Sequence, residues 1–222
     1  MVKQRNRDKL MKKFRMMMLV GVLFSASVMA APSDSLIAQY NQAAEGDEEA
    51  VELVYQQLDK LIEAQGADAL SLVYLGSTEA LMGRDAFMPW NKMKYTEQGL
   101  ATIAKGLDLL QVSETPLAQQ EIRQGLPEAY LARAIAAATY TSLPDMFNHF
   151  ERGYDLFLDL LADEQFQQQH YDATSWIYIY AIEAALRAED SDQASKWLSF
   201  MQQKNANHPL TIQAQAILDK AA

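Results

Sequence analysis

The chain of 222 residues contains no cysteine, which limits both how it is stabilised and what chemistry it can perform. Disulfide bonds are excluded, so the fold depends on packing alone. Thiolate ligands are excluded too, which removes the commonest structural zinc sites. A bacterial lipid anchor is also ruled out, because it is attached to a cysteine just after the signal sequence.

Motifs of catalysis and of phosphate binding are missing as well. The sequence has no Gly-x-Ser-x-Gly nucleophile elbow and no glycine-rich phosphate loop. Two histidines one turn apart would suggest a metal site, but no such spacing links His149, His170 and His208. We expect His170 and Asp172 near a helix start, as capping or solvent-facing residues. The acids at 47–49 are expected to open a helix, where its dipole favours them. We therefore predict no catalytic residue, no metal and no cofactor, and a protein that is not an enzyme.

Basic residues are scarce beyond the first thirty positions. Those positions hold seven of the 19 lysines and arginines but only one of the 29 acids, so residues 31–222 carry 12 basic against 28 acidic groups, a formal charge of −16. A field of this sign repels nucleic acid and anionic lipid headgroups, so we predict no nucleic-acid partner. The hydrophobic share of 50% is sufficient for a core and argues against disorder.

Residues 11–30 have the pattern of a secretory signal peptide. A basic stretch precedes the apolar run 16–24, and small residues follow it up to Ala30. The run is shorter than the roughly 20 residues needed to span a bilayer. Val28 and Ala30 fit the positions that a signal peptidase reads, so we predict cleavage between Ala30 and Ala31. The mature protein is then expected in the periplasm, without a stable membrane anchor.

The domain organisation follows from this cleavage site. We predict a signal peptide at 1–30 and a single helical domain at 31–222, long enough for one core. The first ten residues only lengthen a basic region that is already complete at Met11. We therefore expect translation to start at Met11, and the alternative is a long basic region that starts at Met1.

Helical periodicity covers the mature chain. No segment shows the period-two alternation of β-branched residues that is typical of a strand. Helical stretches open at prolines 89, 127, 144 and 209, where the missing N–H is tolerated, and a short helix is expected at 117–123. We predict an all-α fold of about eight to ten helices, arranged as antiparallel pairs with turns near residues 46, 83, 144 and 190.

The second helix of most pairs carries a small residue where two helices approach, with bulky residues one turn away. These small residues include Ala50, Gly99, Gly153 and Ala194. The rhythm resembles the second helix of a tetratricopeptide repeat, loosely over 34–204 and best over 176–209. The resemblance implies an α-solenoid with a concave face that holds a peptide or another protein. Successive turns lie 37, 61 and 46 residues apart, against about 34 in the family, so the repeats are degenerate. An irregular helical bundle without a groove is the alternative.

The segment Arg84–Lys94 is the least ordinary part of the chain. It lengthens a turn that such repeats keep short, and residues 84–105 have a local charge of +2 within an acidic chain. A large aromatic side chain among cations is typical of a binding hot spot. We predict that the partner-binding residues are Arg84, Asp85, Trp90, Lys92 and Lys94. In the alternative, structural interpretation, Arg84 and Asp85 pair to fix the turn, and Trp90 fills the gap between two hairpins.

A dense group of aromatic residues at 171–180 provides a second candidate. Trp176 and Tyr180 are one turn apart and share a helix face, whereas Tyr178 points elsewhere. One of the two faces is expected in the core. The other aromatic face, with Trp176 and Tyr180, either lines a groove or is buried as well. The preferred interpretation is that both faces are buried.

These features together predict a periplasmic, non-enzymatic scaffold or adaptor that binds a peptide or protein partner. The alternative is a small-ligand or cell-wall-fragment binding protein, with a pocket lined by Trp176 and Tyr180. A closed apolar pocket would favour the small ligand, and an open groove would favour the protein partner.

Overall fold

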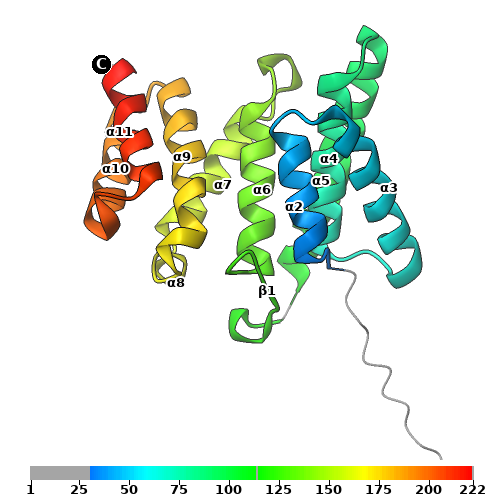
Figure 1. The fold of residues 1–222 in the computed structure, drawn as a ribbon, viewed down its shortest axis with the longest axis horizontal. Coiled ribbons are helices and arrows are strands. Elements are labelled where there is room, and N and C mark those ends of the chain that lie inside the picture. The colour runs from blue at the N-terminus through cyan, green and yellow to red at the C-terminus, as the bar shows by residue number, and fades with distance from the viewer. Residues whose placement is uncertain (1–30, 114, 222) are drawn as a thin grey trace, which may run out of the picture.

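The computed structural model describes residues 31–113 and 115–221, and most of this part of the chain is helical (Figure 1). The predicted signal peptide lies outside the described residues. Within them the chain forms ten α-helices, two 3₁₀ turns and one two-stranded sheet. The predicted all-α fold is therefore confirmed. None of the described helices combines the length and the hydropathy that a membrane-spanning helix requires.

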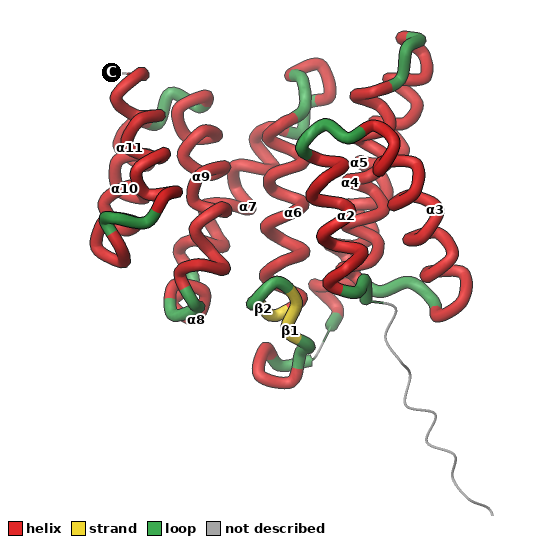
Figure 2. The backbone as a smooth tube through the Cα atoms, in the orientation of Figure 1, coloured by secondary structure: helices red, strands yellow, loops and turns green. Residues whose placement is uncertain are grey.

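The helices follow one another as antiparallel pairs (Figure 2). The four pairs are α2 (Asp34–Ala44) with α3 (Glu48–Gln65), α4 (Ala69–Asp85) with α5 (Pro89–Val112), α6 (Glu128–Ser142) with α7 (Phe150–Ala162), and α9 (Tyr171–Arg187) with α10 (Ser191–Asn205). The short α8 (Glu164–Gln167) precedes the last pair, and α11 (Pro209–Ala221) packs against both of its helices.

The pairs form a row, from α3 at one end of the molecule to α10 and α11 at the other (Figure 1). The first helices of the pairs contact one another in the order α2, α4, α6, α9. The four turns within the pairs lie at one edge of this row, and the connections between pairs lie at the opposite edge. The first helices therefore present neighbouring faces along the row.

Carboxylates fix the start of several helices, as predicted for the acids at 47–49. The Asp47 side chain accepts a hydrogen bond from the Ala50 N–H at the start of α3. At the start of α4, Asp68 and Ser71 form a reciprocal capping box. Such caps satisfy N–H groups that a helix end leaves without partners. The start of α5 differs, because this helix begins at Pro89 without a side-chain cap.

The contact between α4 and α5 is the most extensive in the molecule, because glycines let the two backbones touch. A Cβ added at Gly76 would lie 2.5 Å from the Gly99 carbonyl oxygen, and one added at Gly106 would lie 2.8 Å from the Ala69 carbonyl oxygen. Real Cβ atoms do not approach so closely, so these helices can meet only where a side chain is missing. The small residues seen in the sequence therefore mark true helix contacts.

Two arginines tie neighbouring first helices together at their C-terminal ends. Arg84, in the last turn of α4, donates hydrogen bonds to the carbonyl oxygens of Ala43 and Ala44 at the end of α2, at 3.0 and 3.1 Å. Arg187, in the last turn of α9, donates to the Thr141 carbonyl oxygen at the end of α6, at 2.6 Å. Both arginines thus donate to carbonyl groups in the last turn of a neighbouring helix, where few intrahelical donors are left.

The prediction of a short helix at 117–123 is confirmed only over Leu117–Gln119, in 3₁₀ form, and is wrong for the residues that follow. A 3₁₀ turn is followed by a hairpin of β1 (Ile122–Arg123) and β2 (Leu126–Pro127). The turn residues Gln124 and Gly125 have φ angles of 51° and 79°, as in the two-residue turn that matches the twist of paired strands. A helix cannot continue through two such residues.

Pro144 does not open a long helix, contrary to the prediction. It precedes a 3₁₀ turn at Asp145–Phe147, and Asn148, with a φ of 52°, reverses the backbone before α7 begins at Phe150. Asparagine tolerates this left-handed conformation better than most residues. The third pair is therefore joined by a longer turn than the other three. The expectation that Arg84–Lys94 lengthens the turn of the second pair is wrong, because α4 extends to Asp85 and α5 begins at Pro89.

Candidate functional site

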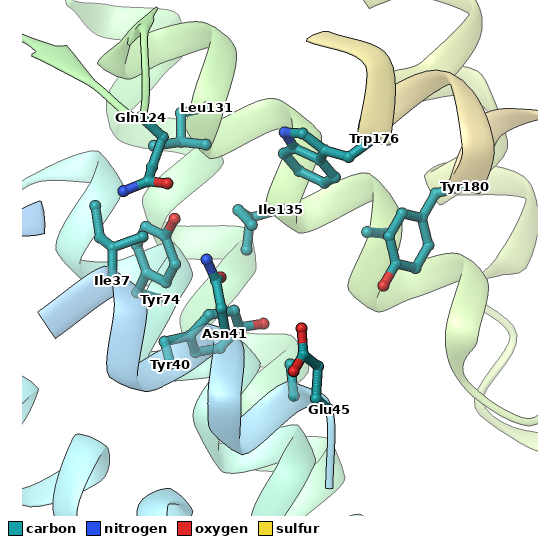
Figure 3. A pocket seen from close by; sticks show the side chains of 12 residues that line it. Ile37, Tyr40, Asn41, Glu45, Tyr74, Gln124, Leu131, Ile135, Trp176 and Tyr180 are labelled. Atoms are coloured by element: carbon teal, nitrogen blue, oxygen red, sulfur yellow. The ribbon is translucent and has the colours of Figure 1, made fainter. Parts of the chain in front are cut away.

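A groove runs over the face formed by α2, α4, α6 and α9. It consists of an inner section of about 410 Å³ and a tip section of about 670 Å³, whose walls share Tyr40, Ala44, Ala138 and Tyr180. The inner section extends toward Trp176 (Figure 3), and the tip section extends to the turns that join α4 to α5 and α6 to α7. Because four residues belong to both walls, the two sections form one continuous surface.

Helical spacing explains how each first helix presents a stripe of side chains to the groove. Residues three, four and seven apart lie on the same side of a helix. In the inner section, α2 contributes Ile37, Tyr40, Asn41 and Ala44. Helix α6 contributes Leu131, Ile135 and Ala138, and α9 contributes Trp176 and Tyr180. The groove is therefore built from three separate helical stripes brought together by stacking.

Two aromatic pairs line the inner section. Tyr40 and Tyr74 meet edge to face with ring centres 4.8 Å apart, and Trp176 and Tyr180 do the same at 6.0 Å. Figure 3 shows Trp176 and Tyr180 on α9 and Tyr40 on α2, with the hollow between them. Edge-to-face packing favours one arrangement of each pair, so these rings offer preformed apolar walls.

Three hydroxyl groups join α2, α4 and α6 where the two sections meet. Thr139 Oγ1 donates a hydrogen bond to Ser77 Oγ at 2.8 Å, and both residues lie beside the buried Tyr40. Burial raises the pKa of Tyr40 to about 12, and hydrogen bonding with Ser77 and Thr139 opposes that rise. Tyr40 is therefore uncharged at physiological pH, and this part of the wall is polar but neutral.

The tip section has mainly apolar walls. They include Leu81, Pro89 and Met93 on the side of α4 and α5, and Pro144, Met146 and Phe147 on the side of α6 and its following turn. Three large apolar side chains near these walls are exposed: Phe87, between α4 and α5, exposes 91% of its surface, Trp90, in the first turn of α5, 64%, and Met146, in the turn after α6, 65%. Large apolar side chains that gather at a protein surface in this way mark an interaction site.

Three of the predicted partner-binding residues have structural contacts. Arg84 and Asp85 form an ion pair at 2.6 Å, and Lys92 Nζ donates a hydrogen bond to the Arg84 carbonyl oxygen at 2.8 Å. Hydrogen bonding to Asp85 raises the pKa of Arg84 above its usual value, so the guanidinium stays charged. The predicted pairing of Arg84 with Asp85 is confirmed. Arg84 and Lys92 also line the tip section, whereas Asp85 does not.

The other two predicted residues, Trp90 and Lys94, lie outside the groove walls. Trp90 is 64% exposed, so the interpretation that it fills a gap between hairpins is wrong. The physical reason is that Pro89, Lys92 and Met93 form the side of the α5 start that faces the next hairpin, and Trp90 is not among the residues that line this hollow. Lys94 Nζ lies 5.6 Å from the ring centre of Tyr95.

The structure brings the two regions singled out in the sequence into one groove. Tyr180 lines the tip section together with Arg84 and Lys92, and it lines the inner section with Trp176. Tyr178, on the other face of α9, is buried and stacks on Phe200. The preferred interpretation that both aromatic faces are buried is wrong, because Tyr180 is 41% exposed.

Sequence reasoning missed most residues of the groove, among them Tyr40, Tyr74 and Met146. Ile37, Tyr40 and Ala44 have the spacing of one helix face, but spacing does not tell whether a face meets the core or a groove. Met146 lines the groove because it lies in the 3₁₀ turn after α6; a turn near residue 144 was predicted, but its 3₁₀ form was not.

The histidines give no sign of a metal centre. His170 is the N-cap residue of α9 and Asp172 lies in its first turn, as predicted. Asp172 lies 3.6 Å from His170 Nδ1 and 3.5 Å from His208 Nε2. The described residues contain no group of three or more side chains placed to hold a metal ion.

Comparison with protein-family models, with curated proteins and with solved structures finds no match to this chain. Its function must therefore be argued from the groove itself.

Proposed function

We propose that this chain is an exported, non-enzymatic interaction module that holds a segment of a partner protein in its groove. The observation that carries the proposal is the continuity of the inner and tip sections across four successive first helices. Stacked helical hairpins commonly use such an extended face to bind other proteins.

The groove is open to solvent, which supports a polypeptide partner over an enclosed small ligand. Asn41, Glu45, Gln124 and Tyr180 in the walls of the inner section are all exposed. Sites for small ligands bury about 70–90% of the ligand surface. Here the aromatic pair on α9 stands at an open side, where it can contact a longer chain.

The groove walls are held in place without a ligand. Arg84 fixes α2 against α4, Arg187 fixes α6 against α9, and Thr139 with Ser77 joins α4 to α6. A preformed site loses less conformational entropy when a partner binds, so more of the contact energy appears as affinity. This rigidity supports a binding function that does not depend on a large rearrangement.

The proposal places the module in the periplasm, because residues 11–30 have the pattern of an export signal and no cysteine is present. We also assign the chain to the tetratricopeptide-like repeats, as a degenerate member. The stacked antiparallel pairs and the small residues at their contacts support this assignment.

A bulky side chain at the junction of the two sections tests the proposal. Ala138 lines both, so Ala138→Trp should block the groove. The photo-crosslinking residue p-benzoyl-phenylalanine, placed at Tyr180 in cells, would capture the partner in the periplasm. Ala101→Trp is the matched control, because Ala101 is exposed on α5 and lies outside the groove walls.

We expect a dominant protein adduct in the parent chain and in Ala101→Trp, and little or none in Ala138→Trp. Circular dichroism should show that both tryptophan variants are folded. Equal adduct yields from the two variants would contradict the proposal. A small molecule that raises the melting temperature, in a chain that yields no protein adduct, would favour the small-ligand alternative.

A further inference from the structure

The walls of the tip section carry positive charge, whereas the chain as a whole is acidic. Its walls include the cations Arg84 and Lys92, and none of the described residues that line it is a carboxylate. Residues 31–222 carry a formal charge of −16, so this positive hollow is a local exception.

Two carboxylates that neighbour wall residues of the tip section in the sequence are already paired. Asp85 binds Arg84 at 2.6 Å, and Asp145, on the turn after α6, forms an ion pair with Arg187. Lys92 forms no ion pair within the described ranges, and its ammonium is held at the wall by the Arg84 carbonyl oxygen. Of the three cations, Lys92 is therefore the one whose charge is left uncompensated.

The start of α5 adds to the positive potential. Helix α5 begins at Pro89, in the wall of the tip section, and has neither a side-chain cap nor an acid in its first turn. By contrast, Asp47 caps α3 and Asp68 caps α4. The partial positive charge at the N-terminus of α5 is thus left without a carboxylate in its cap or its first turn.

The apolar part of the surface surrounds these charges. Pro89, Met93 and Phe147 lie in the wall, and two exposed side chains lie close to them in the sequence, Phe87 before α5 and Trp90 in its first turn. Burying such side chains against a partner favours binding, because it removes apolar surface from water. The surface therefore suits a ligand that combines an apolar group with a negative charge.

We propose that the tip section binds a segment of the partner polypeptide in which an apolar side chain is followed directly by an acidic side chain, with Lys92 as the counter-ion of that acid. This inference rests on the proposed function and names the chemistry of the bound segment. The apolar side chain occupies the hollow, and the carboxylate lies between Lys92 and the start of α5.

The charge distribution favours a polypeptide over an anionic membrane. All four turns within the pairs lie at the same edge (Figure 1), and the first and last of them are acidic. Glu45 and Asp47 flank the first turn, and Glu189 and Asp190 form the last. A flat anionic bilayer would bring these carboxylates close to lipid phosphates, whereas a narrow segment reaches the tip section alone.

Peptide pools of defined charge test the inference. Three pools of immobilised hexapeptides, acetylated and amidated, contain Phe followed by Glu, Gln or Lys among uncharged randomised positions. The purified protein is passed over each pool, and the retained amount is measured. Lys92→Met removes the charge but keeps the aliphatic chain. Lys94→Met is the matched control, because Lys94 lies two residues away on the same helix but outside the wall.

We expect the parent chain to be retained about fivefold more on the Glu pool than on the Gln pool, as for one partly screened ion pair, and least on the Lys pool. Lys92→Met should abolish the preference for Glu, Lys92→Arg should restore it, and Lys94→Met should keep it. Equal retention of the parent chain on the Glu and Gln pools would overturn the inference, and so would loss of the preference for Glu in Lys94→Met. Stronger binding to phosphatidylglycerol vesicles than to the Glu pool would also overturn it.

Failure of this inference is distinguishable from failure of the proposed function. If Ala138→Trp blocks crosslinking but Glu and Gln are bound equally, the groove binds a partner without the proposed charge preference. If no pool retains the protein and Ala138→Trp crosslinks as the parent chain does, both proposals fail.

Discussion

Arg84 shows how a single side chain can be part of a binding surface and of the fold. Its guanidinium donates to two carbonyl oxygens at the end of α2 and pairs with Asp85, while its side chain lines the tip section. Arg187 makes the equivalent contacts from α9 to the end of α6. The sequence marked Arg84 as a site residue through local charge, but the structural contact spans about 40 positions and was not readable from spacing.

Arg84→Met is expected to destabilise the protein by about 2 kcal/mol, because charge-assisted hydrogen bonds to two helix-end carbonyls are lost. Urea denaturation followed by circular dichroism measures this change. Lys94→Met removes a charge from the same region without such hydrogen bonds, so it should change stability by less than about 0.5 kcal/mol. Similar losses in both variants would show that the carbonyl contacts of Arg84 do not stabilise the fold.

Truncation of two tryptophans to alanine is expected to change the stability of the protein to very different extents. Trp90 is 64% exposed and Trp197 is 6% exposed. Trp90→Ala is therefore expected to change the free energy of unfolding by less than about 0.5 kcal/mol, and Trp197→Ala to lower it by about 3–5 kcal/mol. Thermal unfolding of the two variants checks the prediction. A large loss in Trp90→Ala would mean that this ring is packed after all.

Glu128 is expected to make stability depend on pH. Burial raises the pKa of Glu128 to about 7 from 4.5, with repulsion from Asp68 adding to the rise and Arg123 opposing it. The folded state binds this proton more tightly than the unfolded state, so stability is lost as the pH rises from about 4.5 to about 7. Glu128→Gln should therefore stabilise the protein by about 1–2 kcal/mol at pH 8, after allowance for solvent screening, and hardly at all at pH 4. Urea denaturation at the two pH values measures the difference, and an equal effect at both would contradict the assignment.

At the scale of the elements, much of the fold could be predicted because its determinants are local. Local sequence sets the helix starts at Asp47 and Pro89, because each depends on residues within a few positions. The same holds for the helical stripe through Trp176 and Tyr180. The hairpin at Gln124–Gly125 was missed because its strands are only two residues long, too short for any alternation to show. The groove was not predictable, because it depends on which helix faces remain uncovered after stacking.

Gly99→Ala tests the tight contact between α4 and α5. In an exposed helix this change stabilises by about 1 kcal/mol, because alanine is the better helix former. Here the new Cβ would lie 2.9 Å from the Ala80 amide nitrogen and still closer to the Gly76 carbonyl oxygen. We expect a loss of about 1–3 kcal/mol instead, as for overpacked cores. The sign of the change, from urea denaturation, decides between the two cases.

At the scale of the whole molecule, the row of pairs predicts how stability is distributed. Each pair packs mainly against its neighbours, and α11 covers the last pair through contacts with α9 and α10. A solenoid of this kind is stabilised by each unit and by the contacts between adjacent units, so damage at one end stays near that end. A bundle around one shared core would instead unfold as a unit.

Ala214→Glu distinguishes these two architectures. Ala214 on α11 is fully buried, so a carboxylate there would lose its hydration and force α11 from its place, at a cost of about 3 kcal/mol. Hydrogen exchange followed by mass spectrometry should then show faster exchange in α9, α10 and α11, with protection in α2 to α5 unchanged. Gln215→Glu is the control, because Gln215 is adjacent on α11 but only partly buried. Uniform loss of protection along the described helices would show that the pairs share one cooperative core. Loss confined to one end would show that the groove over α2 and α4 is stable independently of α11.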